Sequence, residues 1–507
     1  MKKFKSFLRN VIFPAIISLI TAPAFLVSIG TMLLSKEEFN KQSRFIFLFS
    51  MTMGQIVYSM ISSTKMGIVW LPVLDGLFLN EKIKGVIYSL QKPLSHLFIN
   101  HLFILWFINM LTVIAGLSIA LCKKGHCILK MPLTVEHAVG LFTGIYFVMS
   151  PKVLYDGDYK MESSLKILIQ SVISIIGLVV FKFYMSPIVL SVYLILITVL
   201  FCLLRYFTGS MFFKSLFTQE TATSFNFNND FLNYMDKDCE IMPMFIVKTL
   251  HYILSMVCLN LLMFSVAILL YKKKFYPKLD LNREFLAFSI ANLASFISTG
   301  TVNYACSGLF ILTGKTRQVS SIALGVMCTL LFGLIKYILN YVPIVSSLFL
   351  MQFMGFMYLY EYIIIISKLS WFDGFQVILF TGLNFINGGV LIIFLIAMVM
   401  VPCMRLLVNR GILKKKMVVE SAIDNSYVYY IPKVLDAFNI HGVLKEIHKM
   451  HVVLCQKIVI DFSKCVFVDI NGNVLLQTFL SENKIEYEIR GNSLNLYRTT
   501  ENTLKKI

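Results

Sequence analysis

Two stretches of this sequence place polar side chains inside otherwise apolar segments, and they carry the groups best suited to bind a solute. The first, Ser62–Val73, reads SSTKMGIVWLPV, and the second, Ser298–Thr316, reads STGTVNYACSGLFILTGKT. Both offer hydroxyl groups, and they add an amide, a tyrosine and lysines where Leu, Ile and Phe are usual. Such groups form hydrogen bonds and neutralise charge, so they indicate reversible binding rather than covalent chemistry.

Lys65 is the most distinctive of these residues, because a cation at membrane depth is costly and usually functional. In a binding site it would neutralise an anion or compete with a cationic solute. The alternative is structural, since a lysine near a helix end can extend its ammonium group to the membrane interface. The ends of the neighbouring apolar segments are not sharply defined, so the sequence leaves both interpretations open.

The elements that position these stretches are predicted to be membrane-spanning helices. The chain has 507 residues, of which 57% are hydrophobic and 14% charged, and its mean hydropathy is +0.77. Soluble domains carry about a quarter charged residues. Apolar runs recur to about Arg405, and many reach the roughly 20 residues that cross a bilayer. They are continuous rather than alternating, which favours a polytopic helical protein over a β-barrel.

The apolar runs divide into two sets of about seven, within residues 11–205 and 243–405. The third span of each set, 66–79 and 301–313, is short and interrupted by polar residues. Interrupted spans at corresponding positions of two halves are typical of transporters built from inverted repeats. The alternative is that both are small-residue faces for helix packing. The predicted spans are 11–34, 44–61, 66–79, 100–121, 133–150, 165–182, 186–204, 243–270, 286–300, 301–313, 318–339, 344–366, 374–386 and 388–405.

The formal net charge of +19 is explained by the orientation of the spans. If Met1 is cytoplasmic, the loops rich in Lys and Arg all fall on the cytoplasmic side, as the positive-inside rule requires. This predicts an even number of crossings, about 14, with both termini in the cytoplasm. No nucleic-acid-binding motif accompanies the charge, so no nucleic-acid partner is predicted. The ten scattered cysteines lack ligand spacing, and neither a metal site nor a cofactor is predicted.

Residues 411–507 differ from the rest and predict a small soluble α/β domain, which leaves residues 1–410 as the membrane domain. IVIDF (458–462) and VFVDI (466–470) are predicted strands, NVLLQTFL (473–480) an amphipathic helix and IEYEIRG (485–491) a further strand. Strands that alternate with a helix are typical of such domains.

Several motifs resemble the SulP family of anion permeases. LDLNREFLAFSIANLASFISTG (Leu279–Gly300) is similar to the entry of span nine, where that family has Asn-Arg-Glu-Leu before a Gly-Leu-Ala-Asn-Leu run. TGKTR (313–317) resembles the loop after span ten, and YVPIVSSLFLMQFMGFMYLY (341–360) resembles span twelve. Residues 458–476 resemble a STAS domain, the cytoplasmic module that ends these permeases. In the first half, MGQIVYSMISSTKMGIV looks closest to the fungal vacuolar-type branch.

The resemblance implies an all-α polytopic membrane protein of about 14 spans in a seven-plus-seven inverted repeat, followed by the α/β STAS domain. Core and gate domains would move by alternating access. Half-helices three and ten would meet near the midplane and turn their positive N-termini and free amides toward an anion. It assigns substrate binding to residues on both half-helices, with Pro23, Ala24 and Phe25 of span one nearby: Ser62, Ser63, Thr64, Lys65, Gly67, Thr301, Val302, Asn303, Tyr304 and Ser307.

The sequence also departs from the family pattern. The Ser-Arg-Ser common near span ten is replaced by NYACSGL, which has no arginine. Span eight lacks a carboxylate and offers Asn260, for which a hydrogen bond between helices is the simpler role. The span-thirteen aspartate is Asn384 here. These differences weaken a prediction of proton-coupled sulfate uptake. In the tail, Asp469 is followed by Ile470 rather than a phosphorylatable serine, so the domain is expected to serve folding, dimer contacts or partner binding.

The function that these features favour is secondary-active or facilitative transport of a small anion, such as sulfate, across a lipid bilayer. The alternatives are an amino-acid transporter of an intracellular, vacuolar-type membrane and a non-transporting sensor or motor with the same fold. A homodimer is expected, and a protein partner of the STAS domain is possible; the sequence does not choose between plasma membrane and organelle. An enzyme is disfavoured, because no HExxH, Walker loop or paired acid–base constellation is found.

Overall fold

The computed structural model describes most of the predicted spans and the strands of the tail. The described residues are 40–63, 70–72, 77–89, 94–125, 133–155, 160–184, 187–208, 242–275, 279–297, 303–305, 344–367, 369, 371–385, 419–421, 427–430, 434–435, 443–448, 458–461, 467–468, 476, 479–480 and 487–490. The predicted spans 11–34, 318–339 and 388–405 and the predicted domain boundary at 410 lie outside these residues.

The predicted spans on described residues form helices close to their expected bounds, apart from the two interrupted ones. In the first half these are α3 (Asn40–Ile61), α5 (Leu94–Leu121), α6 (Leu133–Tyr155), α7 (Lys160–Tyr184) and α8 (Pro187–Thr208). In the second half they are α11 (Met242–Phe275), α12 (Leu281–Ile297), α15 (Ile344–Ser367) and α16 (Trp371–Asn384). Within the described part, α5, α7, α11 and α15 are long and apolar enough to cross a membrane.

Each of the two interrupted spans contains a short strand where a helix was expected. Instead of a span over 66–79, the chain forms strand β1 (Trp70–Pro72) and then helix α4 (Leu77–Tyr88). Within the predicted span 301–313, the described residues form strand β2 (Asn303–Ala305). The hydropathy pattern missed α4 because Glu81, Lys82 and Lys84 interrupt its apolar residues.

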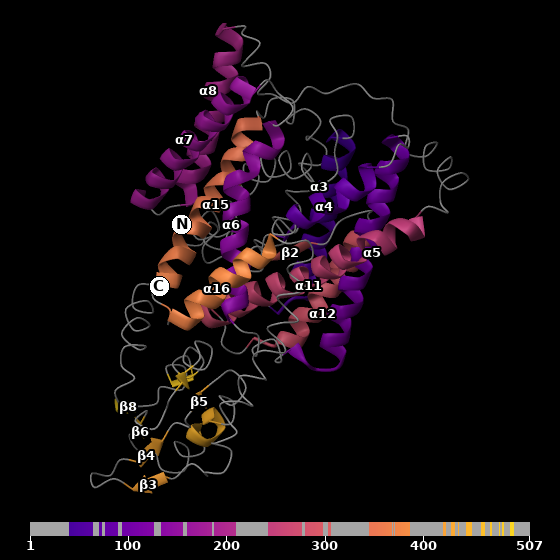
Figure 1. Ribbon diagram of the computed structural model, residues 1–507. Coiled ribbons are helices and arrows are strands. Elements are labelled where there is room, and N and C mark those ends of the chain that lie inside the picture. The colour runs from indigo at the N-terminus through magenta and orange to yellow at the C-terminus, as the bar shows by residue number, and fades with distance from the viewer. Residues whose placement is uncertain are drawn as a thin grey trace, which may run out of the picture.

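The helices gather into two bundles (Figure 1). The first bundle consists of α3, α4, α5, α11 and α12 around the two short strands. The second bundle consists of α6, α7, α8, α15 and α16. Within the first bundle α12 packs extensively on α5 and α3, and within the second α6 packs on α15 and α16.

Helices from the two halves of the sequence pair antiparallel, as an inverted repeat requires. At one end of the α3–α12 contact, Ser62 lies beside Glu284, and further along, Ser295 donates a hydrogen bond of 3.1 Å to the carbonyl of Ser50. The second bundle repeats this relation between α6 and α15. Each pair joins corresponding helices of the two halves, and both halves contain the order helix, short strand.

The α6–α15 crossing is close because glycines line it. A β-carbon at Gly144 would lie 3.2 Å from the carbonyl oxygen of Gly355, and one at Gly355 would lie 2.8 Å from the amide nitrogen of Val148. Gly140, one turn before Gly144, lies under the ring of Tyr362. Small residues four apart let helix backbones approach closely in membranes, where packing drives association.

Polar groups reinforce this crossing through Gln352 of α15, which is 1% exposed. Its amide nitrogen donates to the carbonyl of Val148 on α6, at 3.0 Å, and to the hydroxyl of Ser171 on α7, at 3.2 Å. Its amide oxygen accepts a hydrogen bond of 3.1 Å from Ser174. One buried side chain thus joins three helices of the second bundle, which favours their movement as a unit.

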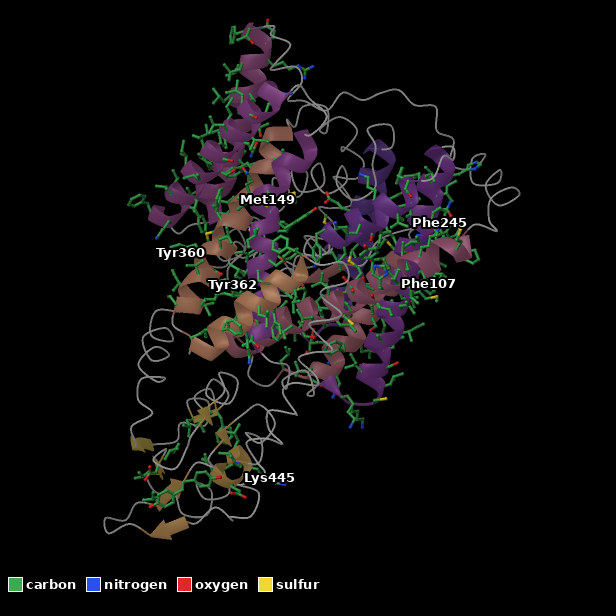
Figure 2. All side chains as sticks on the ribbon, viewed as in Figure 1. Phe107, Met149, Phe245, Tyr360, Tyr362 and Lys445 are labelled. Carbon is green, nitrogen blue, oxygen red and sulfur yellow. The ribbon has the colours of Figure 1, made fainter. Side chains whose placement is uncertain are left out.

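The outer surface of the second bundle is apolar. Leu168 and Phe183 on α7 and Leu196 on α8 are 60%, 81% and 61% exposed, and Figure 2 shows side chains projecting outward along both helices. At the end of α7, Lys182 donates a hydrogen bond to the hydroxyl of Tyr360, which Figure 2 places on α15. A large apolar surface of this kind is stable against lipid chains rather than water.

The tail contains a four-stranded sheet with the order β3-β4-β6-β8. Its strands are β3 (Val419–Ser421), β4 (Tyr427–Tyr430), β6 (Ile458–Asp461) and β8 (Tyr487–Arg490), and β5 (Val434–Leu435) pairs separately with β7 (Phe467–Val468). Strands β4, β6 and β8 run parallel, whereas β3 is antiparallel. The three strands predicted in the tail are confirmed as β6, β7 and β8.

A short helix over 443–448 packs on this sheet. Ile447 is fully buried, and the hydroxyl of Tyr429 donates a hydrogen bond of 3.1 Å to the carboxylate of Glu446. Burial, together with the nearby Glu446 carboxylate, raises the pKa of the Tyr429 phenol. The phenol therefore stays protonated at neutral pH and keeps its role as donor.

We expect Gly355→Ala to destabilise the second bundle by about 1–3 kcal/mol, because the added methyl group would overlap backbone atoms that cannot move independently. Gly382→Ala in α16 is the matched control, since nothing lies within 4 Å of its added β-carbon. Thermal unfolding of the two purified variants in detergent measures the difference. Equal melting temperatures would contradict the close crossing.

Candidate functional site

The two polar-interrupted stretches meet in the first bundle. Strands β1 and β2 pair antiparallel, with Trp70 opposite Ala305, Leu71 opposite Tyr304 and Pro72 opposite Asn303. These residues are far apart in sequence and come from corresponding positions of the two halves. The pairing that the sequence suggested for the two stretches is therefore present in the fold.

The strand pair is enclosed by helices, which explains how non-helical backbone is accommodated. Helix α3 contacts both strands, and α11 and α12 contact β2. In a membrane, irregular backbone is tolerated only where protein or a wet cavity surrounds it, because lipid satisfies no hydrogen bonds. The two strands satisfy part of this need by bonding to each other.

Helix α4 begins at Leu77, five residues after β1 ends at Pro72, so at most about 18 Å of extended chain separates its N-terminus from the strand pair. Its 12 residues span about 18 Å, too little to cross the roughly 30 Å hydrocarbon core. It is therefore a half-helix. Its first turn carries no acidic residue, so the positive end of its dipole is not neutralised from within the turn.

Ser62 and Ser63, which the sequence analysis assigned to substrate binding, directly follow the end of α3. Their donors converge on the carboxylate of Glu284 in the first turn of α12. The Ser62 hydroxyl donates at 2.7 Å, and Ser63 donates from its hydroxyl at 2.6 Å and from its backbone amide at 2.8 Å. Tyr58 adds a fourth hydrogen bond, at 2.8 Å.

Glu284 is fully buried, so these four donors replace the water that an ionised carboxylate would otherwise bind. Two donors face each carboxylate oxygen, Tyr58 and Ser62 on one and Ser63 on the other. The arrangement fixes the end of α3, and hence the start of the connection to β1, against α12. We call this group of Tyr58, Ser62, Ser63 and Glu284 the carboxylate clamp.

Neighbours of Glu284 extend the same junction. The Asp280 carboxylate caps α12 by accepting a hydrogen bond of 3.0 Å from the amide of Asn282. The Asn282 side chain accepts one of 2.9 Å from the amide of Gly125, which follows α5. Arg283 donates to the carbonyl of Ile61 at the end of α3, at 3.2 Å. The sequence analysis used these residues only for a family resemblance; a carboxylate at the start of an apolar helix was the signal for their structural role.

The other predicted site residues are only partly described. Asn303 and Tyr304 belong to β2, where their backbone pairs with Pro72 and Leu71. The remaining residues predicted for the site and its surroundings lie outside the described part of the chain: Pro23, Ala24, Phe25, Thr64, Lys65, Gly67, Thr301, Val302 and Ser307.

Buried hydrogen bonds hold α4 and α11 against α5. The Asn80 side chain of α4 pairs with His101 of α5 at 2.9 Å, and both residues are fully buried. The amide nitrogen of Asn260 on α11 donates to the Thr112 hydroxyl at 3.2 Å. This confirms the inter-helix role predicted for Asn260. Among the described residues, no group of three or more His, Cys, Asp or Glu side chains is placed to hold a metal ion.

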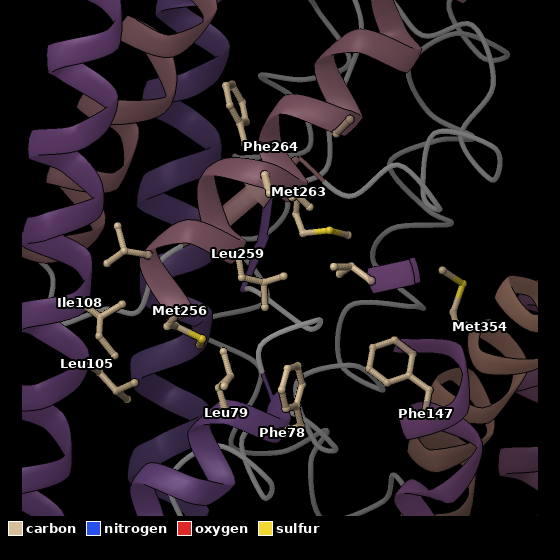
Figure 3. Packing of buried hydrophobic residues seen from close by; sticks show 14 of the residues in the cluster. Phe78, Leu79, Leu105, Ile108, Phe147, Met256, Leu259, Met263, Phe264 and Met354 are labelled. Carbon is tan, nitrogen blue, oxygen red and sulfur yellow. The ribbon is translucent and has the colours of Figure 1, made fainter. Parts of the chain in front are cut away.

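The half-helix α4 also touches the second bundle. The ring of Phe78 lies 4.4 Å from that of Phe142 and 6.0 Å from that of Tyr146, both on α6. Figure 3 shows Phe78 and Leu79 of α4 close to Met256 of α11 within the buried apolar cluster. Phe142 also contacts Phe385, just after α16, at 4.7 Å. The start of α4 thus lies where the two bundles meet.

The sequence matches no protein-family model and no curated protein sequence, but its fold has relatives among solved structures. The transmembrane domain of the cyanobacterial bicarbonate transporter BicA aligns with a TM-score of 0.53 at 11% identity, covering 76% of this chain and 95% of that one. The overall structure of SLC26A9 aligns with the same TM-score at 10% identity, covering 98% and 87%.

The inward-facing murine Slc26a9 anion transporter also has a TM-score of 0.53, at 11% identity, and the alignment covers 96% of this chain and 87% of that one. The chain has the SLC26-type transporter fold. These three SLC26-type neighbours are transporters rather than enzymes, and the apolar helices agree with an integral membrane protein.

We expect Glu284→Ala to lower the free energy of unfolding by about 2–4 kcal/mol, because it leaves two buried and two partly buried donors without their acceptor. Asp280→Asn is the control, since asparagine also caps a helix N-terminus. Thermal unfolding in detergent should separate the two variants clearly. A Glu284→Ala protein as stable as Asp280→Asn would show that the clamp contributes nothing.

Proposed function

We propose that the chain carries a small anion across a membrane by alternating access, with the anion bound between the N-termini of two half-helices. The observation that supports this most directly is the pairing of β1 with β2, which brings corresponding interrupted segments of the two halves together. Helix α4 is one half-helix, and the residues after β2, where the sequence predicts the second within 301–313, lie outside the described part of the chain. Free amides and the positive dipole end at such a position suit a negative charge.

The neighbours support the same substrate class. BicA is described as a bicarbonate transporter and murine Slc26a9 as an anion transporter. For this chain we take a small inorganic anion, such as sulfate, bicarbonate or chloride, as the substrate. Lys65, Asn303 and Tyr304 are the residues we propose to contact it, together with Phe25, Thr64, Thr301, Val302 and Ser307. Ser62 and Ser63 would act indirectly, because their hydroxyls bind Glu284.

The division into two bundles supplies the moving parts of this proposal. We assign the first bundle to the core domain that carries the anion and the second to the gate domain. Buried polar contacts hold each bundle together, whereas the described contacts between them include the aromatic rings at Phe78 and a limited packing of α11 on α6. Packed apolar surfaces can slide between discrete arrangements.

We further propose that the tail is a STAS domain on the cytoplasmic side and that two copies of the chain form a homodimer. The parallel order of β4, β6 and β8, together with the helix over 443–448, supports an α/β domain of this kind. Its role would be in dimer contacts or in binding a protein partner. Both termini would lie in the cytoplasm, in agreement with the distribution of Lys and Arg.

The test is uptake into proteoliposomes that contain the purified full chain, with radiolabelled sulfate, bicarbonate, chloride and a neutral amino acid as probes. We expect saturable uptake of at least one anion, and a decrease of about tenfold or more in Lys65→Ala and Asn303→Ala, which corresponds to the loss of one charge-assisted contact. Lys248→Ala, an exposed lysine on α11, is the control and should transport normally.

The other outcomes each favour a different function. Uptake of the amino acid alone would favour the amino-acid transporter. Charge movement in a voltage step without flux of any probe would favour the sensor. Normal kinetics in both Lys65→Ala and Asn303→Ala would remove the proposed site.

A further inference from the structure

The half-helix α4 carries a carboxylate, Glu81, on the side where the two bundles meet. Glu81 lies one turn after Phe78, whose ring contacts Phe142 and Tyr146 of α6. It is four residues from Leu77, where α4 begins, so it lies about 6 Å along the axis from the helix N-terminus. A buried or half-buried carboxylate at membrane depth is costly and marks a functional position by default.

Tyr146 is the group that faces Glu81 from the second bundle. Its hydroxyl is buried and makes no hydrogen bond of normal length among the described residues, and it interacts electrostatically with the Glu81 carboxylate. The Tyr146 hydroxyl can therefore donate to Glu81 when the two helices approach slightly. A hydrogen bond from a phenol to an ionised carboxylate is stronger than one to a neutral acid.

Among the described residues, the other charged groups that act on Glu81 are on α4 itself. Lys84 and Lys82 both act on the Glu81 carboxylate, and Lys82 is exposed while Lys84 is half-buried. On α5, His101 is tied to Asn80, which belongs to the buried face of α4. On the side of α11, Met256 and Leu259 belong to the same buried apolar cluster as Leu79. Glu81 is the single acidic residue of α4, and it lies at the contact between the bundles.

We propose that Glu81 is the proton-binding residue that couples anion transport to a proton, a role that rests on the transport function proposed above. In this mechanism Glu81 takes up one proton from the aqueous side to which the site is open. It keeps that proton while the bundles move and releases it to the opposite side together with the anion. The proton comes from solution, and no other reactant is required.

Electrostatics gives the reason for the coupling. The anion and an ionised Glu81 carboxylate would both be negative and would lie on the same short helix, so they repel each other. At a separation of about 8 Å and an effective dielectric constant of 20 to 40, one unit of charge changes the affinity by roughly 6- to 30-fold. Because binding linkage is reciprocal, a bound anion favours proton binding to Glu81 by the same factor.

The contact with Tyr146 connects the proton to the movement of the bundles. An ionised Glu81 can accept a charge-assisted hydrogen bond from Tyr146, which holds α4 of the first bundle against α6 of the second. Protonation weakens this contact. The loaded and protonated carrier can then separate α4 from α6, whereas the ionised carrier without an anion is held in place.

The decisive variant is Glu81→Gln, which has the shape of the protonated side chain and cannot release a proton. Initial uptake rates of radiolabelled sulfate, chloride and bicarbonate are measured in proteoliposomes between pH 5.5 and 8 for each protein. In the wild type we expect the apparent KM for the transported anion to rise about tenfold as pH increases. In Glu81→Gln we expect a low apparent KM that does not change with pH, and a pH gradient should no longer drive accumulation.

Two control variants make the result specific. Glu81→Asp retains a titrating carboxylate and should retain the pH response of the wild type. Glu361→Gln removes an exposed carboxylate of α15 and should change neither the apparent KM nor its pH dependence. Thermal unfolding of each variant in detergent reports whether it is folded, and a misfolded Glu81→Gln is replaced by Glu81→Asn in the same assay.

The outcomes distinguish this inference from the proposed function. If the wild type transports none of the anions, the proposed function of anion transport is wrong, and the inference about Glu81 is wrong with it. If the wild type transports an anion and Glu81→Gln shows the same pH dependence, only the role of Glu81 is overturned. A wild type whose apparent KM is independent of pH also overturns it, while transport remains.

Discussion

The junction between the two halves of the membrane domain depends on one buried carboxylate. Glu284 has no access to water and is stabilised by four donors that all come from α3 or the two residues after it. Removing such a group from water is tolerated only when its hydrogen-bonding capacity is filled. The position of α3 relative to α12 is therefore tightly specified. Because β1 follows α3 and β2 follows α12, the strand pair and the start of α4 depend on the same junction.

The second bundle achieves rigidity by a different means. Its α6–α15 crossing relies on glycines that let two backbones approach, and on Gln352, which bonds to α6 and α7 together. The contacts within each bundle include polar and geometrically specific ones, whereas those described between the bundles are the rings of Phe78, Phe142 and Tyr146 and a limited packing of α11 on α6. Specific contacts inside rigid bodies and less specific contacts between them are suited to a motion of whole bundles.

Long apolar helices were predictable because their length and hydropathy are set by the membrane itself. Helices α5 and α15 accordingly follow the predicted spans closely. Helix α4 was missed because a half-helix in the protein interior is not selected for apolar residues, and Glu81, Lys82 and Lys84 interrupt its pattern. Composition alone also cannot place Ser62 and Ser63, since the acceptor of their hydrogen bonds is more than 200 positions away in the sequence.

The pairing of corresponding helices makes the two halves of the fold similar in their contacts. In the described contacts, α6 packs on α16 and α15 packs on α7. Each of these helices therefore contacts the other half of the chain in the same way as its counterpart does. In the proposed transport cycle, exchanging the conformations of the two repeats would change the side of the membrane to which the site is open. If the chain alternates access as proposed, the duplicated architecture would supply the opposite-facing state through an exchange of conformations between its two halves.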